Sequence, residues 1–61
     1  MTTMEIYSGF MLTAVKQSNG DWMVEIVRFG GSGKPFLTQA FREMKAAMAA
    51  ARLIVDRGIT R

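Results

Sequence analysis

Apolar and polar positions alternate along two neighbouring stretches, YSGFMLTAVKQ and DWMVEIVRF, which the tripeptide SNG separates. Alternation with a period of two is typical of β-strands, and Asn-Gly between two such stretches indicates a hairpin turn. A type I turn with a left-handed glycine and a bulge places Gln17 opposite Asp21. We therefore expect an antiparallel hairpin whose register runs back from this pair.

The expected register sorts the hairpin side chains into two faces, because successive side chains of a strand point to opposite sides. The first face is entirely apolar and consists of Phe10, Leu12, Ala14, Trp22, Val24 and Ile26. The second face consists of Gly9, Met11, Thr13, Val15, Met23, Glu25, Val27 and Phe29. A solvated face is ordinarily polar, and a two-residue Asn-Gly loop would also leave large apolar side chains on both faces. The sequence therefore predicts that something beyond a single helix covers the second face.

A third strand and a helix follow the hairpin. The stretch PFLTQAF alternates well enough for a short strand, and Pro35 at its start is compatible with the edge of a sheet. Strong helix formers fill the range Arg42–Arg57, and Gly58 is a natural C-terminal cap. The helix start stays open between Gln39 and Glu43, because no good N-cap residue precedes it. At helical spacing, the apolar stripe comprises Met44, Ala47, Met48, Ala51, Ile54 and Val55, with Phe41 at its edge.

These elements predict an α+β fold: a three-stranded antiparallel sheet in the order β-β-β-α, with one C-terminal amphipathic helix packed on one face. Residues 1–61 would form a single domain. A chain of 61 residues buries only about 60% of the surface that its unfolded form exposes. It has no cysteine and no histidine, which excludes disulfides and the commonest metal ligand. We expect no metal site and no cofactor, and expect packing within one copy or across a dimer to supply the stability.

Membrane and export signals are missing from the pattern. No window approaches the ~18 to 20 apolar residues that span a bilayer. The stretch MTTMEIYSGF lacks the basic start and the apolar run of a signal peptide. We expect a cytoplasmic protein without a membrane partner.

The loop FGGSGKPF resembles a phosphate-binding loop only in part. That motif is G-x-x-x-x-G-K-[ST], in which backbone amides wrap the phosphates and the hydroxyl holds magnesium. Counted from Gly33 and Lys34, the first glycine position holds Arg28 and the hydroxyl position holds Pro35. The acidic residues form no recognisable pair, and the hydroxyl residues have no base partner. We therefore expect a turn, no catalytic residues, no small-molecule substrate and no enzyme activity.

The net charge of +3 belongs to the C-terminal half, where residues 31–61 hold six cations against two acids. In the order of its elements, the chain resembles the arm-site-binding domains of phage and transposon integrases and the sheet-reading domains of plant ethylene-response factors. The matching parts are GDWMVEI, a glycine-containing turn, PFLTQAF and an alanine-rich helix. The resemblance implies a small basic DNA-binding protein. Its nucleic-acid-binding residues would be the cations of the sheet rim and helix, Lys16, Arg28, Lys34, Arg42, Lys45 and Arg52. The sequence departs from those domains on the second sheet face, which offers methionines, valines and Glu25 instead of cations.

A second resemblance rests on GF at the first strand, GDW at the second and AARLIVDRGI at the end of the helix. This pattern is similar to small uncharacterised proteins of bacteria and their prophages, which implies a protein that acts by binding something larger. A contiguous apolar face on so small a domain also predicts a protein contact. The favoured hypothesis is a non-enzymatic interaction protein, such as a phage-encoded or prophage-encoded inhibitor or regulator, that binds a protein partner or its own twin as a homodimer. The partner-binding residues would be Met11, Val15, Met23, Val27 and Phe29. DNA binding is the alternative.

Overall fold

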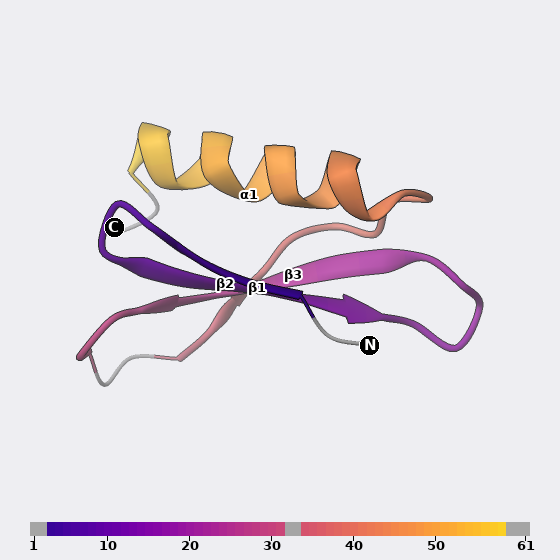
Figure 1. The fold of residues 1–61 in the computed structure, drawn as a ribbon, viewed down its shortest axis with the longest axis horizontal. Helices are drawn as coiled ribbons and strands as arrows, with labels where there is room; N and C mark the ends of the chain where they lie inside the picture. The colour runs from indigo at the N-terminus through magenta and orange to yellow at the C-terminus, as the bar shows by residue number, and fades with distance from the viewer. Residues whose placement is uncertain (1–2, 32–33, 59–61) are drawn as a thin grey trace.

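A computed structural model of the chain describes residues 3–31 and 34–58. In these residues, an antiparallel sheet with the strand order β1-β2-β3-β4 carries a single helix on one side (Figure 1). The elements are β1 (Thr3–Tyr7), β2 (Phe10–Lys16), β3 (Trp22–Arg28), β4 (Phe36–Leu37) and α1 (Met44–Arg57). The expected α+β class, the antiparallel sheet and the C-terminal helix are confirmed. The expected number of strands is wrong, because the described sheet has four strands rather than three.

The additional strand, β1, arises from a turn that the sequence pattern concealed. Ser8 and Gly9 both have positive φ, at 51° and 85°, and Tyr7 pairs directly with Phe10 across them. Two central residues with positive φ characterise the two-residue hairpin turn whose twist matches that of the flanking strands. The stretch YSGFMLTAVKQ therefore contains the end of β1, a turn and β2, rather than one strand. The alternating residues Thr3–Tyr7 form the strand that was missed.

The predicted β2–β3 hairpin is confirmed in register. Lys16 pairs with Trp22, and the backbone N–H of Gln17 donates to the carbonyl of Asp21 at 2.7 Å. Gly20 has a φ of 95°, as the left-handed position of the turn requires. The predicted apolar face of this hairpin therefore points as a unit toward α1.

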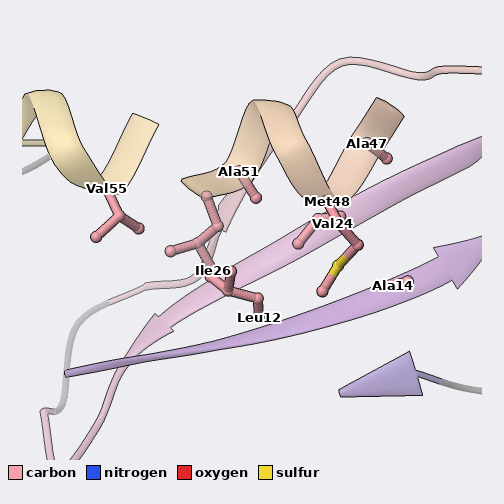
Figure 2. Packing of buried hydrophobic residues seen from close by; sticks show 8 residues of the cluster. All are labelled: Leu12, Ala14, Val24, Ile26, Ala47, Met48, Ala51 and Val55. Atoms are coloured by element: carbon pink, nitrogen blue, oxygen red, sulfur yellow. The ribbon is translucent and has the colours of Figure 1, made fainter. Parts of the chain in front are cut away.

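The core lies between this face of the sheet and α1 (Figure 2). Its buried members are Leu12, Ala14, Val24, Ile26, Ala47, Met48, Ala51 and Val55. Ala47 and Ala51 are both fully buried, and their small side chains let the helix backbone approach the sheet. Met48 reaches from α1 toward the sheet and fills space that an alanine would leave (Figure 2). The apolar stripe expected on the helix therefore packs on the sheet and forms the helix side of the core.

The end of α1 at Arg57 is as expected, whereas its start lies one residue beyond the expected range of Gln39 to Glu43. The helix begins at Met44 after Glu43, whose side chain makes no capping hydrogen bond, and it ends at Arg57 before Gly58. Gly58 adopts a φ of 82°, and its N–H donates to the carbonyl of Val55 at 3.0 Å. A left-handed glycine of this kind satisfies a carbonyl that the end of the helix leaves without a partner.

The strand expected from PFLTQAF is confirmed at the sheet edge but is much shorter than the stretch. Its ladder covers only Phe36 and Leu37. The next residue, the buried Thr38, binds β3 through its side chain. Its hydroxyl accepts a hydrogen bond from the N–H of Val24 at 3.0 Å. Phe41 then forms an isolated bridge with Trp22. A side-chain hydrogen bond thus replaces part of the ladder, which frees the backbone to turn toward α1.

We predict that Leu12→Ala destabilises the protein by about 3 kcal/mol, because Leu12 is fully buried and a cavity would remain. That loss is a large part of the roughly 3–9 kcal/mol expected for 61 residues. The matched control is Leu53→Ala on α1, which removes the same atoms from a side chain that is 52% exposed. The control should change the stability by no more than about 0.5 kcal/mol. Urea unfolding at one fixed protein concentration measures both, and equal losses would contradict this account of the core.

Candidate interaction surface

The sheet face turned away from α1 carries no described element of the chain (Figure 1). We call it the open face. The strand register and the alternation of side chains place nine residues on it. They are Met4, Ile6, Met11, Thr13, Val15, Met23, Glu25, Val27 and Leu37. All but Thr13 and Glu25 are large apolar residues, so the open face has the composition of a buried surface.

Exposure distinguishes the open face from the core. Met4, Ile6, Leu37 and Val15 are 59%, 58%, 55% and 41% exposed, whereas no core residue exceeds 8%. Met11, Met23 and Val27, on the two central strands, are half-buried. Apolar side chains exposed to this extent on one contiguous surface mark an interaction site in soluble proteins.

The structure brings together most of the residues predicted to bind a partner. Met11, Val15, Met23 and Val27 share the open face, on two adjacent strands. Phe29 is 62% exposed and lies in the turn directly after β3.

The sequence prediction missed Met4, Ile6 and Leu37 on this face. The first two lie on the unrecognised strand β1, and the third lies on the edge strand β4. The alternation in TMEIY was the available signal for β1.

The polar residues of the open face lie together at its centre. Thr13 and Glu25 are direct cross-strand partners on β2 and β3. Met4 pairs with Thr13 from β1, and Leu37 pairs with Glu25 from β4. The central row across the sheet therefore reads apolar, polar, polar, apolar.

The six predicted nucleic-acid-binding cations are spread over the molecule. Lys16 and Arg28 lie at opposite ends of the β2–β3 ladder, about 20 Å apart for strands of this length. They are on the helix side of the sheet, where Lys16 lies over the ring of Trp22 and Arg28 lies over that of Phe10. Of the other four, Lys34 lies between β3 and β4, and Arg42 lies between β4 and α1. Lys45 and Arg52 are on α1. The structure therefore does not gather these cations into one patch.

Ionic and polar contacts attach β1 to the exposed side of α1. The guanidinium of Arg52 donates two hydrogen bonds to the carboxylate of Glu5, at 2.8 and 2.9 Å. The hydroxyl of Tyr7 donates to the carboxylate of Asp56 at 3.0 Å. Arg52, which was predicted to contact nucleic acid, is half-exposed in this ion pair.

These contacts shift the pKa values of Glu5 and Tyr7 on β1, and the hydrogen bond with Glu5 raises the pKa of Arg52. The hydrogen bond and the charge of Arg52 lower the pKa of Glu5, although partial desolvation opposes the change. The hydrogen bond to Asp56, assisted by desolvation and by the negative charge of Asp56, raises the pKa of Tyr7. These shifts follow from contacts that join β1 to α1, so the titrations report on that junction.

A shallow groove of about 400 Å³ runs between β1 and α1. Its lining consists of Thr3, Glu5, Met44, Lys45, Met48 and Arg52. Glu5 and Arg52 are bound to each other, so the groove presents a neutralised pair beside Lys45 and two methionines. This arrangement has neither the enclosure nor the convergent polar groups typical of a small-molecule site.

We predict that Tyr7 titrates above its ordinary range and that Asp56→Ala lowers its titration midpoint toward the ordinary value. The stabilising contribution of the neutral hydroxyl is present below the unfolded-state pKa and is lost as pH rises through the higher folded-state pKa. Tyrosinate absorbance measures the midpoint directly, because Tyr7 is the only tyrosine. Asp21→Ala, in the turn at the other end of β2, is the control and should leave the midpoint in place. Equal midpoints in the wild type and Asp56→Ala would refute the contact.

The ion pair of Glu5 and Arg52 should stabilise the protein near neutral pH and lose that effect in acid. Because the folded-state pKa of Glu5 is depressed, its contribution is present above the unfolded-state pKa and vanishes as pH falls through the folded-state pKa. A double-mutant cycle of Glu5→Gln and Arg52→Gln isolates the coupling between the two side chains. Urea unfolding should give a favourable coupling at neutral pH and none in strong acid. A coupling that does not change with pH would argue against a contact between these charges.

Two findings on the described residues and a comparison with known proteins bear on the site. Within residues 3–31 and 34–58, no helix combines the length and the apolar content needed to cross a membrane. In the same residues, no three acidic side chains come close enough to form a metal site. Comparison of the chain with protein-family models, curated proteins and solved structures yields no match.

Proposed function

We propose that this chain is a non-enzymatic protein-interaction module that binds a protein partner through its open face. One observation carries the proposal: seven large apolar side chains occupy one face of the sheet, and no described element of the chain covers them. Removing apolar surface from water is favourable by about 25 cal/mol per Å², so a partner gains binding energy wherever it covers this face. A role as a phage-encoded or prophage-encoded inhibitor or regulator rests on the sequence resemblance alone.

The chemistry of the open face supports a protein as the ligand. Met4, Met11 and Met23 lie on it, and together they are half of the six methionines in the chain. Methionine is flexible and polarisable, so it adapts to the side chains of a partner. The surface is borne by strands and is broad, which suits another protein surface better than an enclosed small molecule.

The charges of the molecule favour this function over DNA binding through the sheet. A sheet that reads DNA must place cations against phosphates and base edges. Glu25 is the one charged residue among the nine that form the open face, and it is acidic. The cations of the sheet rim project to the helix side, at opposite ends of the ladder.

We predict that Val27→Glu abolishes partner binding and leaves the fold intact, because the new charge would be desolvated at the contact. Val27 points to the open face and is not a member of the core. The matched control is Leu53→Glu, which adds the same charge to an exposed side chain of α1. Tagged forms of the wild type and of both variants would be purified from the cells that produce the protein naturally. Circular dichroism verifies that each variant is folded.

The expected result is one bound protein, either further copies of this chain or another protein, retained by the wild type and by Leu53→Glu and lost from Val27→Glu. Retention of the same protein by a folded Val27→Glu would show that the contact lies elsewhere. Loss from both variants would indicate a general effect of added negative charge rather than a specific surface.

A further inference from the structure

The open face is self-complementary, and we propose that a second copy of this chain covers it, with β2 of each copy stacked over β3 of the other. This inference rests on the proposed function and names the partner. A homodimer with two-fold symmetry requires a surface that matches itself when it is rotated onto a second copy. The polarity pattern of the open face meets this requirement in one particular orientation.

A two-fold axis that runs parallel to the strands, midway between β2 and β3, places every position over its cross-strand partner. Thr13 of one copy then lies over Glu25 of the other, and Met4 lies over Leu37. Likewise Met11 lies over Val27, and Val15 lies over Met23. Polar residues therefore meet polar residues and apolar residues meet apolar ones. Aligned sheets cross at about 30°, which displaces the central pair of Thr13 and Glu25 least.

The position of Glu25 selects this axis over the other symmetric one. An axis perpendicular to the strands, along the central row, would place Glu25 over its own copy and so oppose two carboxylates in a desolvated interface. With the parallel axis, each carboxylate meets the hydroxyl of Thr13, which can donate a hydrogen bond to it. The two carboxylates remain diagonal neighbours, so Glu25 limits the affinity even in this arrangement.

The size of the open face indicates a reversible dimer. The four strands contain 5, 7, 7 and 2 residues. At about 3.3 Å per residue and about 4.8 Å between strands, they give a flat area of roughly 330 Å² per copy. Protruding side chains make the accessible area larger, and a standard interface buries about 800 Å² per partner. The interface is therefore smaller than the standard size, and we expect a weak, reversible dimer that dissociates in the micromolar range.

Sedimentation equilibrium tests whether the second copy binds. Between about 1 and 200 µM, the wild type should shift from monomer to dimer without larger species. Glu25→Gln should tighten the dimer about tenfold, because it removes the buried charge and keeps the shape of the side chain. Val27→Glu should weaken it about a hundredfold or more, while Leu53→Glu should not change it. A wild type that stays monomeric throughout overturns the proposal, as does a dimer that Glu25→Gln weakens.

Crosslinking tests the orientation, because the chain has no cysteine of its own and single cysteines can be introduced cleanly. Met4→Cys and Leu37→Cys use exposed positions on the two outer strands. In the proposed stack these positions face each other across about 10 Å, whereas the two Met4 positions are also offset sideways by three strand spacings, about 14 Å. A short bis-maleimide should therefore link a mixture of the two variants several-fold more than either variant alone. Leu53→Cys on α1 is the control and should not be linked.

Other crosslinking outcomes overturn the proposal in distinct ways. Efficient linkage of Met4→Cys to itself would indicate either the perpendicular axis or pairing of two β1 edges into one continuous sheet. Linkage of Leu53→Cys would indicate a dimer through α1 and would also remove the support for the open face. If the wild type is monomeric and yet Val27→Glu loses a different captured protein, the second copy is refuted and the proposed function stands.

Discussion

The packing of α1 on β2 and β3 is the constraint on which the rest of the molecule depends. Ala47 and Ala51 bring the helix backbone close to Leu12, Val24 and Ile26, and the resulting core is small and tightly closed. A single helix of 14 residues covers only the middle of one sheet face. Two consequences follow: β1 extends beside the helix and needs its own attachment, and the opposite face of the sheet receives no cover from the described chain.

Ionic and polar contacts provide the attachment of β1. Glu5 and Tyr7 project toward α1 and contact Arg52 and Asp56. These partners are 47 and 49 residues away in the sequence. Partly exposed contacts of this kind contribute little energy individually but specify geometry, because a bidentate arginine–carboxylate pair tolerates few orientations. In this way β1 extends the sheet, and it adds Met4 and Ile6 to the open face.

Any partner that covered the open face would also increase the stability of the folded chain. A chain of this length has a marginal core, and any partner that binds only the folded state stabilises it by mass action. The pair of Thr13 and Glu25 breaks up an otherwise continuous apolar surface at its centre, which restricts the partners and orientations that can bind without leaving a charge buried. Lys16 and Arg28 are directed to the helix side, so neither places positive charge on the open face.

By itself, the sequence determined the features that depend on local pattern. The Asn-Gly turn set the register of β2 and β3, alternation assigned both faces of that hairpin, and helical spacing together with Gly58 located the buried stripe and the end of α1. Four of the five residues predicted to bind a partner were placed on the open face by that register. The turn at Ser8 and Gly9 was missed, because it interrupts a run that reads as continuous strand.

Only the tertiary structure decided four features. They are the ion pair of Glu5 with Arg52, the hydrogen bond of Thr38 to β3, the separation of the cations, and the position of Thr13 and Glu25 at the centre of the four-stranded sheet. Each of these depends on residues that are distant in sequence, and their meeting is set by the way the sheet and the helix pack rather than by any local preference.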